Sequence, residues 1–169
     1  LQGTYAMPTA EVALLRGRGG LAYLIYAAMI TRFPGSMLAG GNALINFWRH
    51  PTHRMNGVRA VGLLASGRAT DLAEFDASQG PPIHKQGQEW LRAELKSWGR
   101  VSRTPDGRIR TRYWVHFCKK CPDLAGIRDQ QFLEKLADDD RRGWEQIWQD
   151  INLLGERLSN PGGVAPSEH

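Results

Sequence analysis

The first half of the chain consists of apolar stretches separated by breaks rich in glycine and proline. The stretch from Leu21 to Ile30 is apolar on most faces and is followed by Arg32 and Pro34, which predicts a central helix over 21–32. Four further segments carry apolar residues at helical spacing, and these are residues 36–49, 55–66, 70–77 and 85–98. We therefore expect the amino-terminal half to be helical.

The spacing of apolar residues changes after residue 98, where apolar or neutral positions alternate with basic and aromatic ones. This period of two predicts a strand over 109–117, with a shorter partner strand over 100–103. Thr104-Pro105-Asp106-Gly107 lies between them and has the composition of a turn, because proline presets its own φ and glycine accepts a positive φ. The pattern predicts a β-hairpin with one apolar face and one basic face that includes Trp114.

The carboxy-terminal part is expected to be helical again over 127–158, and residues 160–169 form a tail rich in glycine and proline. Acidic residues precede one apolar stripe, which consists of Trp144, Ile147, Trp148, Ile151 and Leu154. This stripe must be buried either against the amino-terminal helices or in a two-fold seam. We expect a homodimer through the helix of residues 140–158, since dimers are the commonest oligomers.

Charge is distributed unevenly along the chain. The chain has 22 lysines and arginines against 17 acidic residues, which gives a formal net charge of +5, and most of the excess of basic residues lies in the middle of the sequence. Residues 85–120 carry ten basic and three acidic side chains, whereas residues 122–158 carry five basic and nine acidic ones. A basic block of this kind indicates a surface that meets phosphate.

The order of helices followed by a hairpin with a basic tip, over residues 54–117, resembles the winged helix-turn-helix domains of bacterial transcription and plasmid-replication regulators. The most similar stretch is Gln88 to Val115. The resemblance implies a mainly α fold with a small β-hairpin, in which a winged-helix core has additional helices at both ends. The parts would be a helical extension (1–53), the winged-helix domain (54–121), a helical segment (122–160) and a flexible tail (161–169).

In that family the helix before the hairpin enters the major groove and the hairpin contacts the DNA backbone. The resemblance thus implies a DNA-binding protein, a transcriptional regulator or a replication factor, with helix 85–98 in the groove and the 103–112 hairpin on phosphate. Arginine and glutamine can recognise bases, and lysine mostly contacts phosphate. The candidate contacts to double-stranded DNA are Lys85, Gln88, Arg92, Lys96, Arg103, Arg108, Arg110 and Arg112.

Two other interpretations of the same residues stay open. The arginines could instead pair with the acidic carboxy-terminal helix of their own chain. The protein could also be an interaction module, an inhibitor or adaptor, that uses tryptophan-rich helices and a basic patch to dock an acidic partner. Glu94 and Lys96 could suggest a nuclease motif, but residues two apart on a helix point to different faces.

Cys118 and Cys121 are spaced like half of a zinc site, and His116 or the histidines at 50 and 53 could complete four ligands. Two cysteines are too few for a disulfide scaffold, so we expect a cytoplasmic protein. No catalytic motif stands out, and we expect no enzymatic activity and no cofactor unless zinc is bound. The longest apolar run is ten residues, too short for a membrane span.

Overall fold

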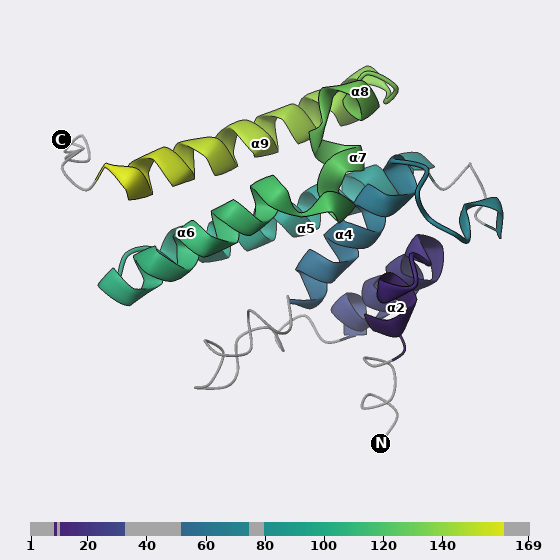
Figure 1. Cartoon of the computed structure of the whole chain (residues 1–169), viewed down its shortest axis with the longest axis horizontal. Coiled ribbons are helices and arrows are strands. Elements are labelled where there is room, and N and C mark those ends of the chain that lie inside the picture. Colours follow the sequence, from purple (N-terminus) through teal and green to yellow (C-terminus); the bar gives the residue numbers. More distant parts are fainter. Residues whose placement is uncertain (1–8, 10, 33–51, 75–79, 161–169) are drawn as a thin grey trace.

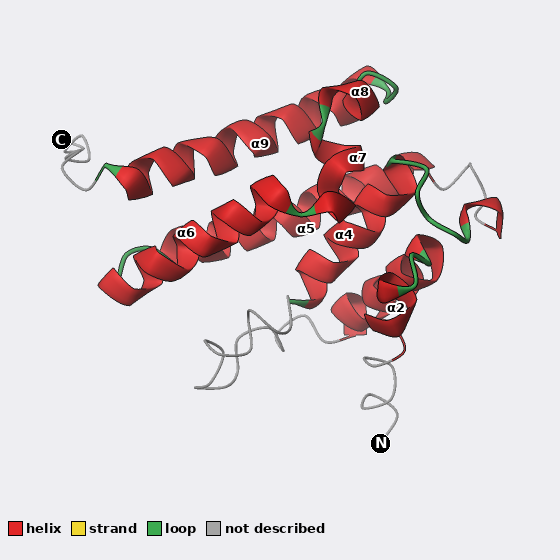
Figure 2. Cartoon of the chain, viewed as in Figure 1, coloured by secondary structure: helices red, strands yellow, loops and turns green. Residues whose placement is uncertain are grey.

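The structure is a computed structural model, and it describes residue 9 and residues 11–32, 52–74 and 80–160. Figures 1 and 2 show that this part of the chain is built from helices joined by short turns. Its longer helices are α2 (Gly19–Arg32), α4 (His53–Ala65), α5 (Gly80–Val101), α6 (Pro105–Lys120) and α9 (Asp138–Ser159). The short elements are the 3-10 turns η1 (Leu72–Glu74) and η3 (Pro122–Leu124) and the single turns α7 (Ala125–Arg128) and α8 (Gln130–Leu133).

The predicted β-hairpin is wrong, and the winged-helix fold class is wrong with it. No described residue lies in a strand, and residues 100–117 instead form the end of α5, a short turn and most of α6. Thr104 is the N-cap of α6, and its hydroxyl accepts the backbone N–H of Gly107 at 3.1 Å. Pro105 follows at the first helical position, where it needs no N–H. The Thr-Pro-Asp-Gly sequence therefore starts a helix rather than turning a hairpin.

The alternating pattern over 109–117 contains a helical stripe. Thr111, Trp114, Val115 and Cys118 recur at three, one and three residues, and all four are buried in α6. Trp114, which the strand pattern placed on the basic face, has no exposed surface and stacks on Trp98 with ring centroids 5.8 Å apart. Another segment of the same chain therefore covers Trp114, and the period of two assigned to residues 109–117 was wrong.

The core lies around α4, which packs against α2, α5 and α7. Its Met55, Val58 and Val61 have no exposed surface. Close approach of neighbouring segments requires small residues, and a Cβ on Gly62 would lie 2.1 Å from the carbonyl oxygen of Asp123. One hydrophobic cluster joins residues from α4 through α9, so the regions 54–121 and 122–160 share a core.

Helix α9 lies across α5 and α6 (Figure 1) and buries its apolar stripe against them. Trp144, Ile147 and Ile151 are fully buried within the single chain, and Trp148 is 9% exposed. The first of the two predicted fates of this stripe, packing inside the chain, is therefore the one observed, although its partners are α5 and α6 rather than the amino-terminal helices alone. The apolar stripe that was expected to form a dimer interface over 140–158 is therefore already buried within the chain.

The helices predicted over 21–32 and 55–66 are confirmed as α2 and α4 with shifted ends, whereas the described part of the helix predicted over 70–77 forms only the 3-10 turn η1, and residues 75–77 lie outside the described residues. The prediction over 36–49 lies outside the described residues. The helix predicted over 85–98 is confirmed as part of α5. This helix begins earlier than predicted, at Gly80, since prolines are tolerated in the first turn of a helix. The expected continuous helix over 127–158 is broken at Asp129 and again before Asp138.

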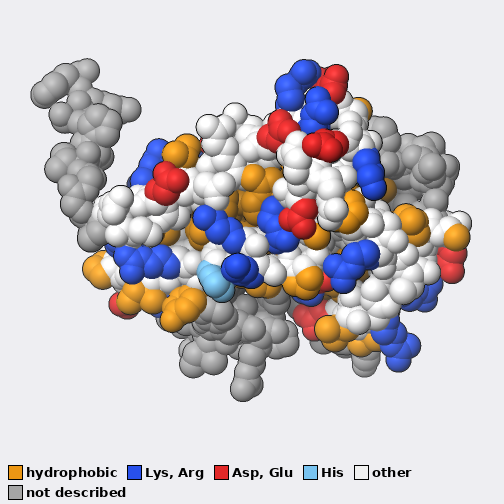
Figure 3. Space-filling model, turned by 45° about the horizontal axis from the view of Figure 1, so that its top comes forward, with side chains coloured by type: hydrophobic (Ala, Val, Ile, Leu, Met, Phe, Trp, Pro, Cys, Tyr) orange, Lys and Arg blue, Asp and Glu red, His pale blue; other side chains and the backbone are white. Residues whose placement is uncertain are grey.

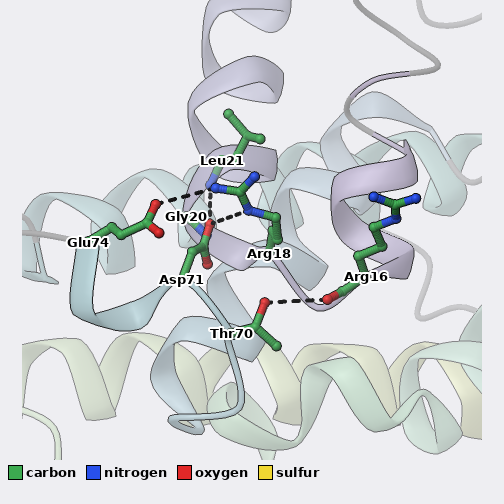
Figure 4. A network of polar contacts seen from close by, with 7 residues as sticks. All are labelled: Arg16, Arg18, Gly20, Leu21, Thr70, Asp71 and Glu74. Atoms are coloured by element: carbon green, nitrogen blue, oxygen red, sulfur yellow. Dashed lines mark hydrogen bonds and ion pairs between the residues drawn. The ribbon is translucent and has the colours of Figure 1, made fainter.

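A buried carboxylate fixes the start of α2 (Figure 4). Asp71, fifty residues away in sequence, accepts the backbone N–H groups of Gly20 at 3.0 Å and Leu21 at 2.9 Å. The first turn of α2 has no acidic residue of its own. Arg18 lies 4.0 Å from the same carboxylate and 3.3 Å from Glu74. Asp71 thus serves as the cap that the local sequence of α2 lacks.

Candidate nucleic-acid interface

The turn between α5 and α6 is a tight corner. Ser102 donates its hydroxyl hydrogen to the carbonyl of Gly99 at 2.9 Å, which closes the end of α5. The backbone then passes so close to itself that a Cβ on Gly107 would lie 1.8 Å from the carbonyl oxygen of Val101. This glycine is required by close approach inside a helix, and its φ is not positive. The corner is therefore held by the sequence immediately around it.

Arginines gather at this corner from three elements and the turn between them. Arg100 and Arg110 line one hollow of about 530 Å³, and Arg103 lies in the turn. Arg108 and Arg112 reach from α6 to the last turn of α9, where Arg157 also lies. We call this group the arginine corner, and its members are Arg100, Arg103, Arg108, Arg110, Arg112 and Arg157.

Two members of the arginine corner bind the end of α9. Arg108 donates to the carbonyl of Arg157 at 3.4 Å, and Arg112 donates from Nε to the carbonyl of Leu158 at 3.1 Å and also from a terminal nitrogen. The last carbonyls of a helix have no intrahelical partner and carry partial negative charge. These two guanidinium groups therefore cap α9, and neither forms an ion pair with a carboxylate of the described residues.

The acidic residues of α9 do not neutralise the corner. Asp138 pairs with Arg141 at 2.6 Å, and Asp139 pairs with Arg142, each within its own helix. Among the residues that the structure describes, no carboxylate forms an ion pair with a member of the arginine corner. The arginines of the corner therefore do not pair with the carboxylates of α9, and two of them bind its carbonyl groups instead.

The outer face of α5 continues the positive charge away from the corner. Lys85, Arg92 and Lys96 are exposed at positions seven and four residues apart, on one side of the helix. Glu89 lies among them and accepts a hydrogen bond from Gln86 at 3.2 Å. On the face of the molecule drawn in Figure 3, lysine and arginine side chains lie among hydrophobic and acidic ones. The outer face of α5 thus exposes lysine and arginine side chains of the kind that bind anions.

Gln88, predicted to contact a base, points into the protein. It is 6% exposed, donates to the carbonyl of Asp140 at 2.9 Å and accepts from Arg92 at 3.3 Å. A Cβ on Gly143 would lie 2.2 Å from its side-chain oxygen, so α9 packs directly on this amide. The amide of Gln88 therefore joins α5 to α9 and is not available to a ligand.

The two cysteines lie at the end of α6 as buried free thiols. Cys118 has no exposed surface and Cys121 is 7% exposed. Burial raises the pKa of both thiols, that of Cys118 well above its ordinary value. In the described part of the chain, no three side chains of histidine, cysteine, aspartate or glutamate are grouped so that they could hold a metal. His116 is exposed and His53 stacks on Tyr26, while the position of His50 lies outside the described residues.

The tryptophans of the described residues belong to the interior. Trp90, Trp114 and Trp144 are buried, and Trp98 packs against the same core. The indole N–H of Trp144 donates to Nδ1 of His84 at 3.2 Å, and burial lowers the pKa of this histidine. An interaction module that presents tryptophans to a partner therefore has no such surface on the described helices.

Sequence reasoning missed several residues of this surface. Arg100 continues the spacing of Arg92 and Lys96 along α5, so that periodicity could have identified it. Arg157 joins the corner only through tertiary packing, and no local signal indicates it. Glu94, 2% exposed, and Lys96, exposed, do lie on different faces of α5, as the spacing predicted.

Comparison of the chain with protein-family models, with curated proteins and with solved structures gave no match. None of the described helices has the length and apolar character that a membrane-spanning helix requires.

Proposed function

We propose that this protein binds nucleic acid through the arginine corner. The observation that carries the proposal is the gathering of six arginines at one end of a helical unit without a described carboxylate as ion-pair partner. Guanidinium groups held close together repel one another, and a polyanion removes that repulsion. Arginine is suited to this role because its planar fork donates two parallel hydrogen bonds to a phosphate.

The arrangement of the corner supports several phosphate contacts at once. Arg100 and Arg110 line one hollow from different helices, Asp106 lines it as well without forming an ion pair with them, and Arg103 is exposed in the turn between the two helices. Lys96 and Arg92 follow along α5 and would extend the contact with the backbone. Arg108 and Arg112 face α9 instead, on a different side of α6 from Arg110, and their capping bonds hold the last turn of α9 against α6.

This mode of binding relies on phosphate rather than on base edges. The β-hairpin wing is absent from the described residues, and the amide of Gln88 is buried, so two parts of the predicted groove-reading machinery are missing. Phosphate contacts carry no sequence information by themselves, but they supply most of the affinity of non-specific binding. We therefore expect affinity that depends steeply on salt concentration.

The test is a fluorescence anisotropy titration of labelled oligonucleotides, single-stranded and duplex, at several salt concentrations. The double variant Arg103→Ala/Arg110→Ala removes two cations that form no side-chain hydrogen bond or ion pair with the described residues. It should weaken binding about tenfold or more at low salt and reduce the slope of log affinity against log salt by about 2.

The matched control is Arg141→Ala/Arg142→Ala, which removes the same charge from the other end of α9. Each of these arginines forms an ion pair with an aspartate three residues away, so little stability is lost. The control should bind nearly as well as the unmodified protein. Absence of binding at low salt, or an equal loss in both double variants, would refute the proposal.

A further inference from the structure

Two hollows lie at opposite ends of α6. The first, of about 530 Å³, contains Arg100 and Arg110 of the arginine corner. The second, of about 540 Å³, is lined by the carboxy-terminal half of α6 together with residues 14 and 15 and the segment 121–123. We call this second hollow the aromatic groove, and the members used below are Leu15, Tyr113, His116, Phe117 and Lys120.

The two hollows share one face of α6. Arg110, Tyr113, Phe117 and Lys120 recur at three, four and three residues, which places them in one stripe along the helix. From Arg110 to Lys120 the helix rises by about 15 Å. A cationic hollow is thus connected to an aromatic one along a single short path.

The aromatic groove presents apolar surface that a soluble protein normally covers. Tyr113 is 50% exposed and Leu15 is 81% exposed, and both line the groove. Ile109 is 55% exposed one turn before Tyr113. Exposed apolar side chains gathered beside a hollow mark a binding surface more often than an accident of packing.

Positive charge lies at the margin of the groove. Lys120 and His116 are exposed on α6 and line it. Arg59 also lines the groove, but Asp123 holds it at 2.7 Å and neutralises its charge. The groove therefore combines an aromatic ring with Lys120, which forms no ion pair with a described carboxylate.

We infer that the nucleic acid is bound as a single strand, with its backbone along the face of α6 and a base against Tyr113 in the aromatic groove. This inference rests on the proposed function. A single strand offers both an unstacked base face for the aromatic ring and a phosphate for the neighbouring cations. In a duplex the base faces are covered by their neighbours, so an aromatic groove would gain nothing from it.

The experiment compares binding of oligothymidylate, about 12 nucleotides long, with binding of a duplex of the same length. The unmodified protein should prefer the single strand. Tyr113→Ala should weaken single-strand binding roughly fivefold to a hundredfold and leave duplex binding nearly unchanged, because the ring that stacks on an unpaired base is removed. Tyr113→Phe keeps the ring and should restore the preference. Unfolding midpoints of both variants establish that they are folded.

Two further variants separate this inference from the proposed function. Leu153→Ala removes an apolar side chain, 41% exposed, from α9 and should change neither affinity. Arg103→Ala/Arg110→Ala should lower the affinity for the single strand and the affinity for the duplex by similar factors. The ratio of the two affinities should therefore stay the same. Nucleic-acid binding with no single-strand preference, or with the same affinity in Tyr113→Ala, overturns the inference but not the proposed function. Failure of every oligonucleotide to bind overturns both.

Discussion

The carboxylate of Asp71 offers the clearest test of how this fold is held together. Replacing Asp71 by alanine removes the acceptor of two backbone N–H groups at the start of α2, those of Gly20 and Leu21. The carboxylate is 4% exposed, and a water molecule has little room to replace it. Gly19 lies so close to the segment that contains Ala69 that a Cβ added to this glycine would be 3.1 Å from the Cβ of Ala69. The two donors would therefore be left without partners in a packed site.

The magnitude follows from the bonds that are lost. Removing an N-cap side chain costs about 0.5–2 kcal/mol, and leaving a buried donor unsatisfied costs about 1–3 kcal/mol. Because these effects overlap, we expect Asp71→Ala to lower the free energy of unfolding by about 2–4 kcal/mol. For a chain of this length each 1 kcal/mol corresponds to a shift of about 2–4 °C in Tm. Asp71→Asn keeps one acceptor oxygen and should lose about half as much.

The assay is urea unfolding followed by circular dichroism, with hydrogen exchange at Gly20 and Leu21 as the local measurement. Glu74→Ala is the control, since Glu74 also pairs with Arg18 at 3.3 Å but its side chain is 73% exposed. Exposed ion pairs contribute little, so this control should change stability by less than about 0.5 kcal/mol. If Asp71→Ala were as stable as Glu74→Ala, with unchanged exchange at Gly20, the capping role would be wrong.

Three further predictions concern the core. Burial raises the pKa of Glu94, so the stability that its proton gives is fully present below the ordinary carboxyl pKa and is lost as pH rises through the raised value; Glu94→Gln should therefore gain stability relative to the unmodified protein as pH rises above the ordinary carboxyl pKa, measured by urea unfolding, and a difference that does not change with pH would contradict this. Gly62→Ala should lose about 1–3 kcal/mol because its Cβ meets the backbone of Asp123, whereas Gly99→Ala, which meets nothing within 4 Å, should gain up to about 1 kcal/mol; similar unfolding midpoints would refute the comparison. Iodoacetamide should label Cys121 before Cys118 in the native protein, as read by mass spectrometry, since Cys118 has no exposed surface; the reverse order would not fit the structure.

The comparison of sequence and structure is most instructive around the arginine corner. The basic block of residues 85–120 and the helix over 85–98 could be predicted from composition and helical spacing, which depend only on neighbouring residues. The hairpin was wrong because Thr-Pro-Asp-Gly suits both a turn and a helix start, and local propensity does not separate the two. What selects the helix is the burial of Trp114 against Trp98, a contact between two elements.

The candidate site was predictable only in part. Arg103 and Arg110 were named from the sequence and do lie at the corner, whereas Gln88 was named and lies buried against α9. A surface position on one helix becomes an interior position when another helix packs on it, and the sequence of α5 does not contain that information. The aromatic groove is formed by segments about a hundred residues apart, so no local pattern could indicate it.

The sequence by itself determined the amphipathic helices and the central excess of positive charge, because both follow from residue type and short-range spacing. Only the tertiary structure decided which sides of those helices face solvent. It placed the stripe of α9 inside the chain and left the arginines of the corner without an ion-pair partner among the described carboxylates. These outcomes depend on contacts between distant segments, whose free energies are set by packing and not by local propensity.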